Sequence, residues 1–164
     1  MARLRSIRRK VATLSRAGLT RQRLVAEAVL RMLAARIVLV VLPFSRVSRR
    51  FGMFVAPTDP RILAQAAALT PAHAATVRQI GWAIRATAPY MPFRSVCLQQ
   101  AMAGQAMLRR RGIATVLHFG AARGQTKAIE GHAWLDAEGI KVTGYPVATN
   151  MTEIACFVHS QGTT

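Results

Sequence analysis

Residues 95–112 read SVCLQQAMAGQAMLRRRG, and this stretch decides the fold. The pattern predicts one helix, with Ser95 as its N-cap and Gly112 as its left-handed stop. Three arginines precede Gly112, where the helix dipole favours positive charge. Cys97 therefore lies in the first turn, where unpaired backbone N–H groups favour a thiolate over a thiol.

A second stretch, GHAWL at residues 131–135, predicts a strand that carries His132. A cysteine at a helix start, served by a histidine from a neighbouring strand, makes a nucleophile near neutral pH. Cys97 and His132 are therefore the predicted catalytic pair. The thiolate would attack an amide, and His132 would protonate the leaving amine. Backbone N–H groups at the helix start would hold the oxyanion. Gln99 and Gln100 are expected to be surface or packing residues.

Composition limits the class of protein. The chain has 164 residues, of which 52% are hydrophobic, so it can form one domain with a real core. The 23 basic residues against 6 acidic ones give a net charge of +17, which suits nucleic acid, an anionic membrane or an acidic peptide. Two cysteines are too few for a secreted disulfide framework, and no signal peptide is visible. We therefore expect a cytoplasmic protein.

The N-terminal part is predicted to be helical. Residues 1–23 form a basic extension, and residues 24–164 form a single domain. Residues 24–44 are largely apolar, but charged residues leave no run close to the ~20 apolar residues that a spanning helix needs. We expect this helix to be buried in the domain, or to contact a partner or a membrane surface. Pro43 ends it, and residues 45–50 form a basic connector. Residues 60–88 are helical, with Thr70 as an N-cap and His73 as a surface residue.

After Gly112 the pattern becomes typical of strands. Strands are predicted at residues 113–119, 132–137, 140–143 and 150–157, with a tight hairpin turn at Glu138–Gly139. Helices therefore come first, and an antiparallel sheet packed on the Cys97 helix follows. This order predicts an α+β domain.

The runs CLQQA at 97–101, LRRRGI at 108–113 and GHAWL at 131–135 resemble the lasso-peptide leader peptidase. This is the B protein of lasso-peptide biosynthesis, a cysteine protease in the transglutaminase-like superfamily, and the likeness covers roughly residues 24 to 157. It implies a papain-like fold and removal of a leader peptide from a ribosomal precursor by Cys97 and His132, without a cofactor. An ATP-dependent lasso cyclase then closes the macrolactam. The short chain resembles the protease-only form, which needs a separate leader-recognition protein.

The third catalytic residue departs from the family pattern. The family's aspartate lies about a dozen residues beyond the histidine, where this chain has Thr143-Gly144-Tyr145. Asp136 shares a strand face with His132 but is ~13 Å away at ~3.3 Å per residue. A two-residue turn predicts that His132 lies opposite Tyr145, so a hydroxyl or backbone carbonyl from that strand could orient the ring. Asn150 or Glu153 could also reach it, and the orienting group stays open.

Other residues and other function classes give rival interpretations. Cys156 and His118 are expected to be a core cysteine and a packed or hydrogen-bonded histidine. A metal site built from Cys97, His132 and Cys156 lacks the usual close ligand pairs and is disfavoured. A nucleic-acid binder is disfavoured because aromatic platforms and finger spacing are missing. A non-catalytic scaffold remains a rival, because the aspartate is missing.

Overall fold

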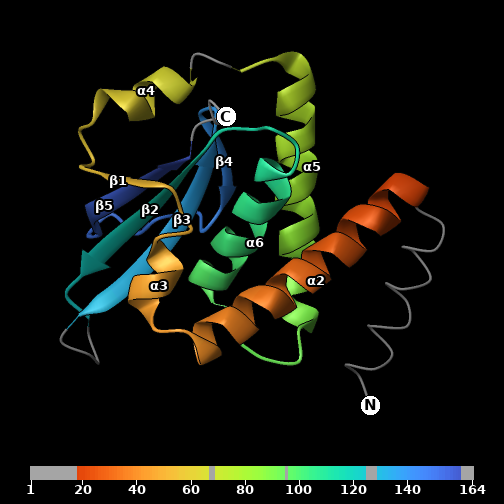
Figure 1. The fold of residues 1–164 in the computed structure, drawn as a ribbon, viewed down its shortest axis with the longest axis horizontal. Helices are drawn as coiled ribbons and strands as arrows, with labels where there is room; N and C mark the ends of the chain where they lie inside the picture. The colour runs from red at the N-terminus through yellow and green to blue at the C-terminus, as the bar shows by residue number, and fades with distance from the viewer. Residues whose placement is uncertain (1–17, 67–68, 95, 125–128, 160–164) are drawn as a thin grey trace.

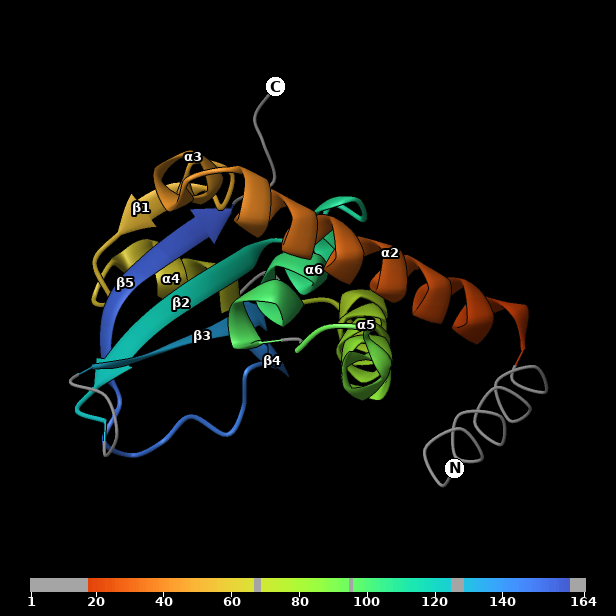
Figure 2. The same cartoon turned by 90° about the horizontal axis from the view of Figure 1, so that it is seen from below.

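The computed structural model describes residues 18–66, 69–94, 96–124 and 129–159. Its centre is a five-stranded antiparallel sheet in the order β1-β5-β2-β3-β4, and helices α2, α5 and α6 lie over one face of this sheet (Figures 1 and 2). This architecture confirms the predicted α+β class.

The elements follow the predicted order, with differences at their ends. The helices are α2 (Leu19–Val41), α3 (Phe44–Ser48), α4 (Pro60–Ala66), α5 (Pro71–Thr87), the 3-10 helix η1 (Ala88–Tyr90) and α6 (Cys97–Arg109). The strands are β1 (Met53–Val55), β2 (Thr115–Ala122), β3 (Glu130–Ala137), β4 (Ile140–Thr143) and β5 (Thr152–His159).

In the N-terminal half, two predictions are corrected and one strand was missed. Helix α2 begins at Leu19, inside the stretch that we assigned to the basic extension; residues 1–17 of that extension lie outside the described residues. The predicted basic connector at 45–50 is mostly helix α3. The edge strand β1 was not predicted, because three residues are too few to show a period. Thr70 caps α5 as predicted, since its Oγ1 accepts a hydrogen bond from the His73 N–H at 3.2 Å.

Helix α6 lies tightly against the sheet because Gly104 faces it. A Cβ at this position would stand 2.8 Å from Leu135 Cδ2 and 3.1 Å from Ile84 Cδ1, so a larger residue would force these buried side chains to shift. Met107 and Leu108 of α6 are fully buried in the same core. The predicted stop is confirmed, because Gly112 has a φ of 68°.

The β3–β4 hairpin has the predicted turn but a different register. Glu138 and Gly139 have φ values of 47° and 80°, as a type I′ turn requires. Pairing runs from Ala137↔Ile140 to Asp136↔Lys141 and then shifts to Leu135↔Thr143. This bulge adds one residue to β4, so the prediction that His132 lies opposite Tyr145 is wrong.

The two faces of the sheet differ in character. Leu117 and Leu135 lie in the main core with α6. Their neighbours His118 and Trp134 point to the other face, since side chains alternate along a strand. There the rings of these two residues stack with centroids 5.4 Å apart. A small second core, which includes Cys156, lies on this face, and Ile62 of α4 packs against it.

Candidate active site

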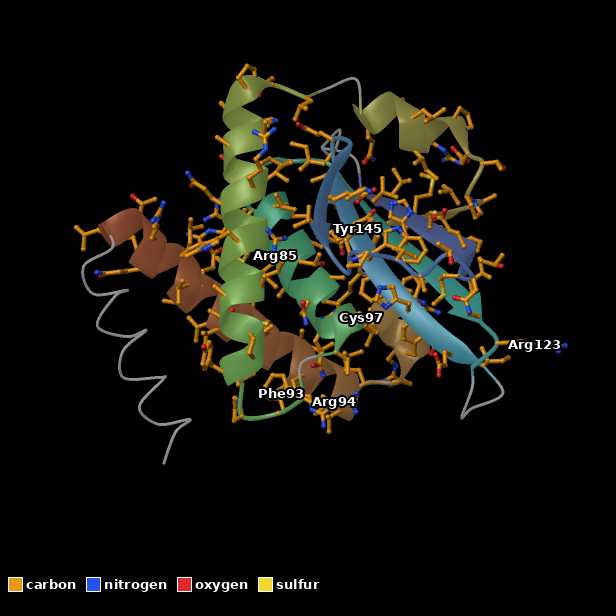
Figure 3. All side chains as sticks on the ribbon, turned by 180° about the vertical axis from the view of Figure 1, so that it is seen from behind. Arg85, Phe93, Arg94, Cys97, Arg123 and Tyr145 are labelled. Atoms are coloured by element: carbon orange, nitrogen blue, oxygen red, sulfur yellow. The ribbon has the colours of Figure 1, made fainter. Side chains whose placement is uncertain are left out.

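Cys97 is the first residue of helix α6, and its free thiol is half-buried. Figure 3 shows it where α6 begins, just after the segment that carries Phe93 and Arg94. The first helical hydrogen bond here runs from the Gln100 N–H to the Val96 carbonyl at 3.2 Å. The N–H groups of residues 97–99 therefore have no acceptor within the helix, and they lie at the same end of α6 as the Cys97 thiol. Val96 is the N-cap, so the predicted cap at Ser95 is wrong; Ser95 itself lies outside the described residues.

Gln99 braces the chain at this helix start. Its side chain is 1% exposed, and its Oε1 accepts a hydrogen bond from the Val96 N–H at 3.2 Å. This contact is half of a capping box, and it fixes the backbone just before Cys97. The expectation of a packing role for Gln99 is confirmed. Its position at N3 of the helix was the signal that could have shown this contact in advance.

His132 lies on β3, half-buried, with its Nε2 atom 2.6 Å from the carbonyl oxygen of Gly144. A carbonyl can only accept, so Nε2 carries the proton and Nδ1 of the neutral ring keeps its lone pair. Trp134 supports the ring, with centroids 6.0 Å apart and planes at 23°. One of the predicted alternatives for the orienting group, a backbone carbonyl after β4, therefore contacts the ring.

Gly144 is required at its position for two reasons. Its φ is +84°, in the region that favours glycine. A Cβ here would lie 2.5 Å from the Ala133 carbonyl oxygen and 2.7 Å from the Trp134 Cα. The backbone of Gly144 therefore sits directly against β3, and this close approach brings its carbonyl to His132.

Cys97 and His132 are not joined by a hydrogen bond in the described part of the chain. His132 shares a strand face with Trp134, whereas Leu135, the next residue along β3, faces α6. By this alternation the His132 side chain lies on the Trp134 face of the sheet and not on the face that carries Leu135 and α6. The catalytic pair therefore stays a prediction.

The other residues considered for the third role have different partners. The Tyr145 hydroxyl donates to Asp136 Oδ1 at 2.6 Å. Burial, together with this hydrogen bond, raises the pKa of Tyr145 well above its usual range. Thr143 Oγ1 is buried and has no hydrogen-bond partner among the described residues. Glu153 contacts His118 instead, and Asn150 lines a hollow at the end of the sheet.

That hollow lies at the β2–β3 end of the sheet. Its volume is about 630 Å³, and its lining residues are Ala121, Ala122, Arg123, Ile129, Asn150 and Thr152. Ile129 stands three residues before His132 along the chain. The hollow thus lies toward the end of β3 where His132 is found, and it offers both apolar and polar contacts.

A second polar group was not foreseen from the sequence. His118 Nδ1 lies 2.5 Å from Glu153 Oε1, and the Cys156 thiol donates to the same oxygen at 2.7 Å. Burial lowers the pKa of His118, but Asp136 and Glu153 outweigh this effect and raise it overall. Burial and the Glu153 carboxylate raise the pKa of Cys156. The expectations of a hydrogen-bonded His118 and a buried Cys156 are confirmed.

His73 also has a structural partner. Its Nδ1 lies 3.0 Å from a carboxylate oxygen of Glu138, whose side chain is 1% exposed. The prediction of a plain surface residue is wrong, because the β3–β4 turn folds back onto the start of α5. This contact holds the hairpin that precedes Gly144.

Comparison with known proteins identifies the family of this domain. A family model described as the transglutaminase-like superfamily matches residues 38–156. No curated protein and no solved structure matches the chain significantly. Among the described helices, none has the length and apolar character needed to cross a membrane. The family match includes Cys97 and His132 and covers well over half of the 164 residues. The chain therefore belongs to the transglutaminase-like superfamily, which includes cysteine proteases.

Proposed function

We propose that this chain is a cysteine peptidase that removes the leader peptide from a ribosomally made lasso-peptide precursor. The observation that carries the proposal is the half-buried thiol of Cys97 at the first position of α6. The resemblance of residues 97–101, 108–113 and 131–135 to the leader peptidase supports the choice of substrate. A separate ATP-dependent cyclase would then close the macrolactam.

The chemistry uses two side chains and the backbone. The Cys97 thiolate attacks the carbonyl carbon between leader and core, and N–H groups at the start of α6 hold the oxyanion. His132 Nδ1, which has taken the proton of the Cys97 thiol to form an ion pair, gives that proton to the leaving amine, and the C–N bond breaks to give a thioester. His132 then takes a proton from water, which hydrolyses the thioester. The Gly144 carbonyl supports this cycle, since it fixes the proton of the neutral ring on Nε2 and leaves Nδ1 as the base.

The hollow near the β2–β3 end is suited to the peptide. Arg123 and Asn150 on its lining can bind acidic groups and peptide amides, while Ile129 offers an apolar contact. The net charge of +17 favours association with an acidic leader. These features support a peptide substrate over a small neutral molecule.

A leader-recognition protein is the proposed partner of helix α2. Three residues at i, i+7 and i+11 form an apolar stripe (Leu30, Ile37 and Val41), and they are 66%, 61% and 69% exposed. The spacing puts all three on one side of the helix. Exposed apolar groups in such a line are typical of protein or membrane contacts. We assign this stripe to the recognition protein, because the resemblance to the leader peptidase implies a partner that delivers the leader.

The test of substrate and partner is a cleavage assay followed by mass spectrometry. Its substrate is the precursor encoded by a neighbouring short reading frame, with and without the recognition protein. We expect slow cleavage alone, a gain of at least about tenfold with the partner, and a smaller gain as salt rises. Equal rates with and without the partner at every salt concentration would contradict the partner assignment.

The stripe has a matched test of its own. Ile37→Asp should remove most of the gain, whereas Leu63→Asp on α4, where Leu63 is 78% exposed, should leave it intact. Loss of binding to anionic vesicles in Ile37→Asp, with the partner's gain unchanged, would assign the stripe to a membrane surface instead.

A non-catalytic scaffold of the maturation complex is the second candidate. Two observations favour it: the family aspartate is absent, and no hydrogen bond joins Cys97 to His132 in the described residues. Alkylation with iodoacetamide separates the two functions. A peptidase should lose cleavage in step with modification of Cys97, while a scaffold should still stimulate the cyclase after modification.

A further inference from the structure

Three side chains converge on the sheet face away from α6. His118 comes from β2, while Glu153 and Cys156 come from β5. Cys156 Sγ lies 3.5 Å from His118 Nδ1, and one atom from each of the three side chains falls within 4.8 Å of the others. His118 and Cys156 are directly opposite each other in the β2–β5 register. These central strands give the group a fixed frame.

A β-bulge brings Glu153 to this face. Simple alternation would point residue 153 and residue 156 to opposite sides of β5. The register shifts from Phe119↔Ala155 to Gly120↔Glu153, so Ile154 is an extra residue in β5. The bulge turns Glu153 back toward Cys156, and bulges often serve to redirect a side chain at functional sites.

We propose that His118, Glu153 and Cys156 bind one zinc ion. Imidazole nitrogen, thiolate sulfur and carboxylate oxygen are the donors that Zn²⁺ uses in proteins. Tetrahedral zinc holds a sulfur and a nitrogen ligand about 3.5 Å apart. Cys156 and His118 already stand at that separation. Glu153 lies closer to both, and its side chain is 31% exposed and has room to move outward.

Asp136 supplies the support that a ligating histidine needs. His118 Nε2 is buried without a hydrogen bond among the described residues, and it lies 3.5 Å from Asp136 Oδ2. The other oxygen of Asp136 accepts from Tyr145 at 2.6 Å, which holds the carboxylate in place. Metal-bound histidines commonly direct their second nitrogen to such a carboxylate. Zinc on Nδ1 would put the ring proton on Nε2, facing Asp136, and the Cys156 thiol proton would pass to solvent.

The distribution of charge points the same way. The chain has only 6 acidic residues against 23 basic ones, yet two of the acidic residues, Asp136 and Glu153, lie beside His118. Within the described ranges, His118 is the ion-pair partner of both, and no lysine or arginine pairs with them. A bound cation would compensate these two carboxylates. The site would clamp β2 to β5, apart from the peptidase chemistry of Cys97.

The experiment uses the purified full chain, stripped with a chelator and titrated with Zn²⁺ and with Co²⁺ as a spectroscopic probe. We expect one Zn²⁺ per chain, a higher thermal midpoint with metal, and a thiolate-to-Co²⁺ charge-transfer band. Glu153→Gln should weaken Zn²⁺ binding at least tenfold, and Cys156→Ser should remove the charge-transfer band. Asp136→Asn should weaken binding by about tenfold or more.

Matched controls separate this site from other groups. Glu130→Gln, an exposed glutamate on β3, and Cys97→Ser should both bind zinc like the wild type. Cys156 is fully buried, so its variant is checked for folding by circular dichroism; the partly exposed Glu153 carries the test if Cys156→Ser misfolds. A wild type that binds no stoichiometric zinc overturns the proposal. So does zinc binding that survives Glu153→Gln unchanged, or Mg²⁺ binding of equal strength.

Discussion

The start of α6 and the β2–β5 face each carry a cysteine, and these two regions differ in what surrounds the thiol. In the first, Cys97 is half-exposed at a helix start, and its predicted partner, His132, is held on β3 by a main-chain oxygen. In the second, Cys156 is buried, and its thiol donates to a carboxylate beside His118. The two cysteines therefore differ first in accessibility, which a reactive thiol needs.

The two regions also divide the acidic residues unequally. Asp136 and Glu153 both lie beside His118, and within the described ranges no carboxylate contacts His132. The region that has the elements of a triad thus has a cysteine that no substrate can reach. At the accessible cysteine the polar groups are the helix-start N–H groups, and a backbone carbonyl holds the His132 ring on β3.

Removal of the accessible thiol is expected to have the largest effect on activity. Cys97→Ala should lower cleavage of the precursor by at least about 1,000-fold, because no other group can form the thioester. Mass spectrometry of the product measures the loss, and the thermal midpoint should stay within a few degrees of the wild type. Cleavage at the wild-type rate would show that the peptidase chemistry belongs elsewhere.

Alkylation at pH 7 sharpens the contrast between the two cysteines. Iodoacetamide should modify Cys97 at least about 100-fold faster than Cys156, since the buried thiol has a raised pKa and little thiolate. Peptide mapping after timed quenching gives the two rates. Equal rates in the folded protein would mean that the second region opens readily.

A substitution at Gly144 tests whether its carbonyl holds the His132 ring. Gly144→Ala should cost about 2–4 kcal/mol of unfolding free energy, because the left-handed φ and the contact with Ala133 are both unfavourable for a Cβ. Cleavage per folded molecule should fall as well, since the carbonyl moves away from His132. Gly131→Ala is the matched control: a Cβ there meets nothing within 4 Å, so both properties should change little. Equal behaviour of the two variants would exclude a special role for Gly144.

The smallest expected effect lies at the far end of the Cys97 helix. Glu27 of α2 binds Arg111 just beyond α6, with Oε2 2.7 Å from Nη2. Burial raises the pKa of Glu27, but the hydrogen bond and charge of Arg111 outweigh it, so the pKa is lowered. Glu27→Gln should therefore cost about 1 kcal/mol at pH 7.

The stabilisation by Glu27 should depend on pH. A carboxylate whose pKa is lower in the folded protein than in the unfolded chain stabilises the fold at pH values above the unfolded pKa. This stabilisation is lost as the pH falls through the folded pKa. The difference between wild type and Glu27→Gln in urea unfolding should thus shrink toward zero below about pH 4. Glu130→Gln, on the sheet, should show little difference at either pH. A gap that persists at low pH would assign the effect of Glu27 to packing.

The sequence predicted the elements better than the contacts between them. The α6 stop at Gly112 and the Glu138–Gly139 turn depend on local backbone chemistry, and the structure confirms both. The register at His132 and the face of Glu153 could not be predicted, because each depends on a bulge. A bulge arises from pairing with another strand and shifts the alternation by one residue.

The Gly144 carbonyl has a consequence for how this chain tolerates substitution. A catalytic aspartate is lost through any change of its side chain, but a main-chain oxygen exists whatever residue carries it. Tyr145 is therefore free to vary as far as His132 is concerned, while Gly144 is constrained only through its backbone and missing Cβ. A saturation library across residues 143–146 should consequently show its strictest position at a residue with no side chain at all.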